Sequence, residues 1–178
     1  VDPLDGTKEF INRNGEFTVN IALIEDQKPI AGVIYVPVSK EIYLGIVNES
    51  AWKVKTEDSE IDTKFVKNNA KKISAEKYSK GKFIVVGSRS HMNEETKVFI
   101  SELEKNHGET DIMSRGSSLK LCMVAEGKAH AYPRFAPTME WDTGAGHAIA
   151  KASGAMVINK ETGNELIYNK EDLLNPWF

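Results

Sequence analysis

Four short runs of β-branched and aromatic residues dominate the first third of the chain and constrain its fold most strongly. They cover residues 17–24, 29–37, 41–47 and 51–54, and only three or four mostly polar residues separate each run from the next. Connections this short join antiparallel neighbours, because parallel neighbours need a crossover of about a dozen residues. The pattern therefore predicts an antiparallel meander.

The rest of the chain changes character twice. Residues 55–82 are polar and of mixed charge, which predicts a solvated surface connection with one short strand near Ile73. Beyond Lys82, strand-like and helix-like segments alternate, as in an α/β layer. The predicted strands cover 83–86, 111–114, 130–132 and 155–158, and the predicted helices run from Asn93 to Gly108, from Ser117 or Ser118 to Gly127, and over 142–153. We therefore expect an α/β fold, divided into residues 1–80 and 81–178.

Composition excludes several classes of protein. A chain of 178 residues with 40% hydrophobic content can bury one sizeable core, and a formal charge of −3 gives no electrostatic footprint for nucleic acid. Cys122 is the single cysteine and lies in an apolar run, so a buried thiol is expected and a disulfide framework is excluded. No apolar run approaches membrane-spanning length. We expect a cytoplasmic protein, and peripheral membrane association stays open.

The chain begins with two carboxylates three residues apart, Asp2 and Asp5. Pro3 restricts one backbone dihedral and Gly6 frees another, so a turn here can hold both carboxylates on one side and expose backbone N–H groups. Carboxylates without histidine or cysteine favour hard cations, and Mg²⁺ is the usual one beside phosphate. Taken alone, the motif is also compatible with an ordinary turn.

A second motif follows in the last third of the chain. Asp142 stands where a helix N-cap is expected, and the small residues of 143–146 come directly after it. A helix N-terminus carries unpaired N–H groups and a partial positive charge, so it suits an anion, while the Asp142 carboxylate can turn to a metal ion. A plain capping role for Asp142 is the alternative.

Together the two motifs, DPLDGT at 2–7 and WDTGAG at 141–146, resemble the signatures of the inositol monophosphatase superfamily of magnesium-dependent phosphatases. Four further segments resemble its 3′(2′),5′-bisphosphate nucleotidase branch: KEF at 8–10, SRSH at 88–91, GSSLK at 116–120 and AYPRF at 131–135. The resemblance covers the whole chain. It implies a layered α-β-α-β-α sandwich and two or more Mg²⁺ ions.

The resemblance also implies roles for individual residues. Asp2 would bridge two metal ions, the Leu4 carbonyl would complete one site, and Asp5 and Asp142 would hold the other ion. Gly6 and Thr7 would meet the scissile phosphate. The hydroxyl of Thr7 would help to position the water, so Thr7 and Asp5 are the expected catalytic residues.

One metal ligand of the superfamily, a glutamate upstream of the first motif, has no counterpart in this sequence, which starts at Val1. We therefore expect a C-terminal portion of a longer protein that is close to inactive alone. Its expected macromolecular partner is the upstream segment of its own chain, or a second copy through the apolar strands between Phe17 and Val54.

The substrate prediction depends on four residues. Ser117 and Lys120 are three apart at a helix start, so they share a face and could hold a second phosphate. Arg134 suits bidentate recognition of that phosphate or of the base. By resemblance His91 would contact the adenine. An exposed lysine and an exposed loop histidine are the alternatives for Lys120 and His91.

These residues lead to one main hypothesis and two rivals. We expect hydrolysis of the 3′-phosphate of the small molecule adenosine 3′,5′-bisphosphate, with 3′-phosphoadenosine 5′-phosphosulfate as a second substrate. The first rival is a module that binds nucleotide and metal without turnover. The second is a phosphatase for inositol phosphate or fructose bisphosphate.

Overall fold

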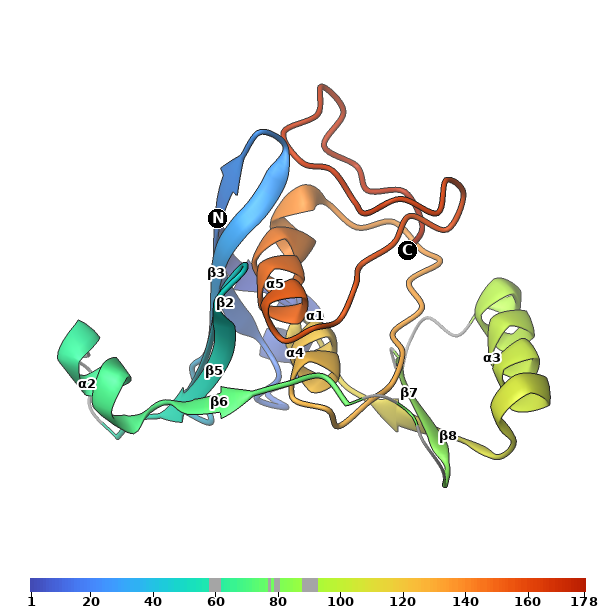
Figure 1. Cartoon of the computed structure of the whole chain (residues 1–178), viewed down its shortest axis with the longest axis horizontal. Helices are drawn as coiled ribbons and strands as arrows, with labels where there is room; N and C mark the ends of the chain where they lie inside the picture. Colours follow the sequence, from blue (N-terminus) through green and yellow to red (C-terminus); the bar gives the residue numbers. More distant parts are fainter. Residues whose placement is uncertain (58–61, 77, 79–80, 88–92) are drawn as a thin grey trace.

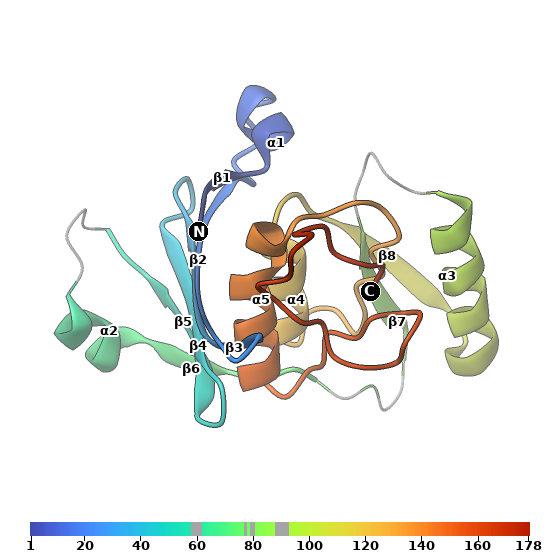
Figure 2. The same cartoon turned by 90° about the horizontal axis from the view of Figure 1, so that it is seen from above.

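The computed structural model describes residues 1–57, 62–76, 78, 81–87 and 93–178. These residues form four successive layers, which Figures 1 and 2 show as a large sheet, the helix pair α4 and α5, a small sheet of β7 and β8, and helix α3. The mixed α/β fold is therefore confirmed. Within the described ranges, no helix is long and apolar enough to cross a membrane.

The large sheet contains six antiparallel strands in the order of the chain. The strands are β1 (Asp2–Asp5), β2 (Thr18–Glu25), β3 (Lys28–Val36), β4 (Glu41–Ile46), β5 (Ser50–Lys55) and β6 (Lys71–Ile73). The predicted meander and the short strand near Ile73 are confirmed. The opening motif was expected as a turn, but it pairs with β2 as a strand, because that pairing satisfies its backbone.

Two short helices were missed by the sequence analysis. They are α1 (Thr7–Ile11) and α2 (Thr63–Asn69). Each is about two turns or less and has no buried residue, so hydrophobic periodicity gave no signal for either. A capping signal existed for α2, because the Asp62 side chain accepts a hydrogen bond from Phe65 N at 2.6 Å.

The α/β layer of the second half is confirmed in its main elements. They are β7 (Phe83–Gly87), α3 (Glu94–His107), β8 (Thr110–Ser114), α4 (Leu119–Ala125) and α5 (Glu140–Ala152), with β7 and β8 parallel. Helix α3 begins and ends as expected: the Asn93 side chain accepts from Thr96 N, and Gly108 follows the last turn with a φ of 84°.

Two predicted strands in the second half are wrong. Residues 130–132 make a single bridge, from Ala131 to Val85, and residues 155–158 make one from Ile158 to Glu165. Pro133 removes a backbone donor directly after the first segment. The second segment turns back on itself within a few residues, since Gly163 N donates to Asn159 O.

Helix α5 lies across the six-stranded sheet and places the second motif beside the first. It packs on β2, β3 and β4. Contact is close because two strand residues beneath it are glycines: a Cβ on Gly45 would lie 2.6 Å from Ile149 Cα, and one on Gly32 would overlap the Ala145 carbonyl. A helix from the second half of the chain thus covers the sheet of the first half. The division near residue 80 stays a prediction.

Candidate metal and phosphate site

A β-bulge brings the two carboxylates of the first motif to the same side. Residues three apart on a regular strand point to opposite faces. In β1, Asp2 pairs with Asn20 and Asp5 pairs with Thr18, so three steps on β1 match two steps on β2. The extra residue of the bulge restores the same facing for Asp2 and Asp5. The Asp2 side chain is further held by Leu4 N, which donates to its Oδ1 at 3.0 Å.

Asp5 is fixed by donors from distant parts of the chain. Its Oδ2 accepts from Ser118 N and from Ser118 Oγ, both at 2.6 Å. Asn20 Nδ2 and Thr18 Oγ1 each lie 3.3 Å from the same oxygen. With Oδ2 engaged, the Oδ1 atom is the one left for a cation.

The sequence analysis did not assign Thr18, Asn20 or Ser118 to the site. A signal was present: Thr18 and Asn20 are polar residues on one face of an apolar strand, and both are almost fully buried. Buried polar side chains need partners, and these two meet at the Asp5 carboxylate.

Asp142 was expected to be the N-cap of its helix, but it is the third residue of α5. Its Oδ2 accepts from Met139 N at 2.8 Å, so the carboxylate reaches back over the first turn. Helix α5 starts earlier because Leu173 O accepts from Glu140 N at 3.0 Å. Ser118 Oγ, which contacts Asp5, also lies 2.8 Å from the Asp142 carbonyl oxygen.

The three aspartates converge. Asp2, Asp5 and Asp142 each offer a carboxylate oxygen, and these oxygens lie within 4.8 Å of one another. Burial, with the negative charges of Asp5 and Asp2, raises the pKa of Asp142 to about 6. Burial also raises the pKa of Asp2. Carboxylates that repel one another in a partly buried site are stabilised by a cation, and an all-oxygen donor set suits Mg²⁺.

Gly6 and Thr7 lie next to this cluster, at the start of α1. Gly6 has a φ of 89°, a left-handed conformation that favours glycine, and the chain turns there from β1 into the helix. Thr7 is exposed. The Glu9 side chain folds back toward Gly6 and Gly116, so it lies beside the same cleft.

Ser117, Lys120 and Arg134, which were expected to bind the second phosphate, lie at one cleft, although Ser117 does so in a different way from the prediction. A cleft of about 140 Å³ is lined by Asp5, Asp142, Lys120 and Arg134 together. Ser117 precedes α4 with a φ of 46°, and its hydroxyl donates to Glu16 O at 2.5 Å instead of facing outward from a helix.

The cation of Lys120 is almost fully buried. Its Nζ donates to Ser117 O at 2.7 Å, and burial lowers its pKa to about 8, an effect that the Asp5 carboxylate opposes. Arg134 donates to Pro137 O at 2.9 Å through Nη2. His91 lies outside the described residues.

Comparison with known proteins places this geometry in a family. The family model described as "Inositol monophosphatase family" matches residues 1–176. The chain is 49% identical over 179 aligned residues to "3'(2'),5'-bisphosphate nucleotidase CysQ" of Salmonella typhimurium, and 48% identical to the protein of that name from Escherichia coli K12. Both alignments cover 100% of this chain and 65% of the relative, so the chain spans about two thirds of their length.

Solved structures agree. The crystal structure of CysQ from Bacteroides thetaiotaomicron superposes with a TM-score of 0.90 at 53% identity, covering 100% of this chain and 67% of the other. Mycobacterium tuberculosis SuhB superposes with a TM-score of 0.70 at 21% identity, covering 98% and 64%, which shows a shared fold. With both motifs at one site and a family match over nearly its full length, the chain belongs to the inositol monophosphatase family.

Proposed function

We propose that the protein containing this chain is a Mg²⁺-dependent phosphatase that hydrolyses the 3′-phosphate of adenosine 3′,5′-bisphosphate. 3′-Phosphoadenosine 5′-phosphosulfate is the proposed second substrate. The observation that carries the proposal is the cluster of three carboxylates, Asp2, Asp5 and Asp142, two of which, Asp5 and Asp142, line one cleft with Lys120 and Arg134. The name shared by the bacterial relatives supports the choice of substrate.

In this proposal, Asp2, Asp5, Asp142 and the Leu4 carbonyl hold two or more Mg²⁺ ions. Bound Mg²⁺ neutralises phosphoryl oxygens and lowers the pKa of a water molecule. The chain itself contributes orientation: backbone N–H groups at Gly6 and Thr7 face the scissile phosphate, and the Thr7 hydroxyl positions the attacking water. Donors at a helix start suit this role because the first N–H groups of a helix have no partner within the helix.

The second phosphate would be bound by Lys120 and Arg134. Ser117 lines the same cleft beside them. Burial lowers the pKa of Lys120, the nearby Asp5 carboxylate opposes this effect, and Arg134 presents a planar fork of donors. A substrate with one phosphate lacks this contact. The pair therefore accounts for a preference for a bisphosphate over a monophosphate.

Phosphate release tests the activity. The protein should release phosphate from adenosine 3′,5′-bisphosphate with Mg²⁺ and not with EDTA. Asp2→Asn, Asp5→Asn and Asp142→Asn should each abolish release while circular dichroism stays unchanged, because each amide removes a charge that holds the metal. Full activity in any folded variant removes that aspartate from the site. Release from inositol 1-phosphate alone, or nucleotide binding without turnover, would favour one of the two rival functions.

The substrate assignment has its own test. Lys120→Met or Arg134→Ala should weaken binding of the bisphosphate by about 1.5–3 kcal/mol per lost charge-assisted bond, which would be measured as a higher KM. The KM for adenosine 3′-monophosphate should stay nearly unchanged. Lys97→Ala is the control, because Lys97 is an exposed residue of α3 that pairs with Glu94. Equal losses on both substrates would contradict the role in binding the second phosphate.

A further inference from the structure

Asn175 lies directly behind the turn that carries Asp142. It is 5% exposed, and its side-chain nitrogen donates to Met139 O at 2.8 Å. The same Nδ2 lies 3.0 Å from Thr143 Oγ1 and 3.2 Å from Thr138 Oγ1. One amide therefore contacts residues on both sides of Asp142.

The orientation of this amide is fixed by chemistry. The Met139 carbonyl can only accept a hydrogen bond, so the nitrogen of Asn175 must face it and the oxygen must point away. In this orientation Asn175 Oδ1 is buried and has no hydrogen-bond partner among the described residues. An aspartate of the same shape would place an acceptor against the Met139 carbonyl.

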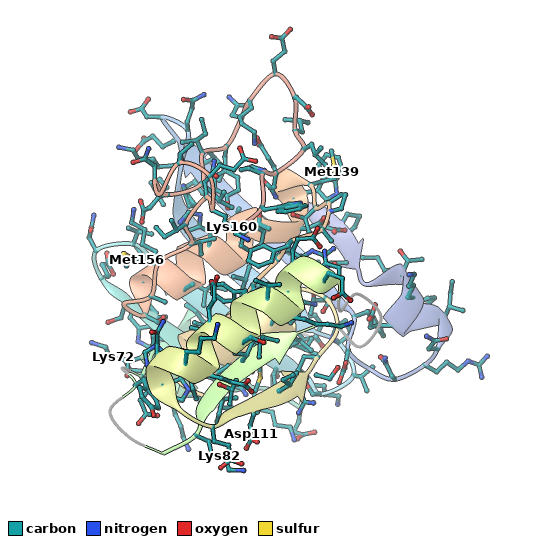
Figure 3. The ribbon with its side chains drawn as sticks, turned by 90° about the vertical axis from the view of Figure 1, so that its right-hand side faces the viewer. Lys72, Lys82, Asp111, Met139, Met156 and Lys160 are labelled. Atoms are coloured by element: carbon teal, nitrogen blue, oxygen red, sulfur yellow. The ribbon has the colours of Figure 1, made fainter. Side chains whose placement is uncertain are left out.

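The backbone of the C-terminal segment follows the same turn. Asn175 N donates to Thr138 O at 2.8 Å, and Leu174 forms an antiparallel bridge with Met139. Figure 1 shows this segment returning over the end of α5 that begins at Glu140, and Figure 3 shows Met139 at that end of the helix, with Met156 at the other. The segment thus determines where the first turn of α5 lies.

The contacts of Met139 link the Asn175 side chain to the metal site. Its N–H donates to Asp142 Oδ2, and its carbonyl accepts from Asn175. A shift of Met139 would therefore move the N–H group that holds Asp142 Oδ2. Thr138 and Thr143, which the amide also contacts, line the cleft beside Asp142.

We propose that Asn175 is a positioning residue for Asp142: its amide holds the 138–143 turn so that the carboxylate faces Asp2 and Asp5. The inference rests on the proposed function, since it assumes that the three carboxylates bind a metal ion. Partners behind a metal ligand commonly change metal affinity by about 10–100-fold. We therefore expect Asn175 to act on metal affinity more than on nucleotide binding.

The test is a titration of the protein with Mn²⁺, a spectroscopic substitute for Mg²⁺. Electron paramagnetic resonance of the Mn²⁺ ion measures how much of it is bound. Asn175→Asp should weaken Mn²⁺ binding by about 10-fold or more. Asn159→Asp is the matched control: Asn159 Oδ1 accepts from Glu161 N at 2.8 Å, and a carboxylate keeps that acceptor. The control should keep the unaltered affinity.

Asn175→Ala removes the amide without adding a charge and serves as the second variant, with thermal unfolding followed for both. In a phosphate-release assay, the Mg²⁺ concentration for half-maximal rate should rise in Asn175→Ala while the KM for nucleotide stays constant. Unaltered Mn²⁺ affinity in a folded Asn175→Asp or Asn175→Ala overturns the inference alone. Absence of Mn²⁺ binding by the unaltered protein overturns the metal site, and this inference with it.

Discussion

Helix α5 makes different kinds of contact on its two sides. The side toward the sheet is apolar and close: Ala145 and Ile149 pack in one cluster with Ile34 and Tyr43. Glycines at two strand positions let the helix backbone approach the sheet. The contact is non-directional, so it determines how near the helix lies, and little about its rotation.

The side toward the C-terminal segment contains a chain of buried hydrogen bonds. His147 Nδ1 lies 3.0 Å from Tyr168 OH, which lies 3.3 Å from Thr143 Oγ1. Asn175 contacts the same Thr143 oxygen. Because hydrogen bonds depend on direction, this side determines the rotation of the helix. Asp142 faces Asp2 and Asp5 only when the helix has both this distance from the sheet and this rotation about its own axis.

The largest effect is expected on the sheet side. Gly32→Val should lower the free energy of unfolding by about 3 kcal/mol or more, because its side chain would meet the helix backbone and not a side chain that can move aside. Ala31→Val is the control: Ala31 pairs with Leu23 and Ile46, which are exposed on the opposite face. Urea unfolding measures both. An equal loss of unfolding free energy in Gly32→Val and Ala31→Val would show that close approach of α5 to the sheet does not depend on a glycine at position 32.

The polar side of α5 should give a pH-dependent stability. Burial lowers the pKa of His147 from 6.5 to about 4, with Glu165 raising it and Lys151 lowering it further. Between these values the unfolded chain binds a proton and the folded chain does not. The contribution of His147 to stability should therefore be complete above about pH 6.5 and fall by about 3 kcal/mol as the pH falls toward 4.

His147→Gln removes this titrating group, so the unfolding free energy of the variant should fall less between pH 6.5 and 4 than that of the unaltered protein. Urea unfolding at several pH values gives this slope. An unchanged slope in the glutamine variant would assign the effect to other groups and break the contrast between the two sides of α5.

The smallest effect on stability is expected on the sheet face opposite α5. Leu23 is 59% exposed there, and Ile21, Val33 and Ile46 are also exposed. Leu23→Lys should change unfolding free energy by only about 0.5 kcal/mol and reduce self-association of residues 1–178, which light scattering can measure. Ile24→Lys, one residue later and packed near Gly144, should destabilise instead. Unchanged association in Leu23→Lys would contradict a role for this face in self-association.

Local patterns in the sequence predicted the strands β2 to β5 and helix α3 closely. The alternation of β-branched residues, the Asn93 cap and the Gly108 stop are preferences that neighbouring residues decide among themselves. The same patterns failed at Asp142, whose helix starts earlier because a carbonyl from residue 173 accepts from its first turn.

The sequence by itself determined which residues form the meander and the main elements of the α/β layer, and its two acidic motifs marked the carboxylates. Only the tertiary structure decided that these carboxylates meet. It does so through the bulge between β1 and β2, through Ser118, which is 113 residues from the Asp5 that it contacts, and through Asn175 behind Asp142. The physical reason is that local conformational preferences act over a few residues, whereas these contacts form between segments that meet only when the chain has packed around α5.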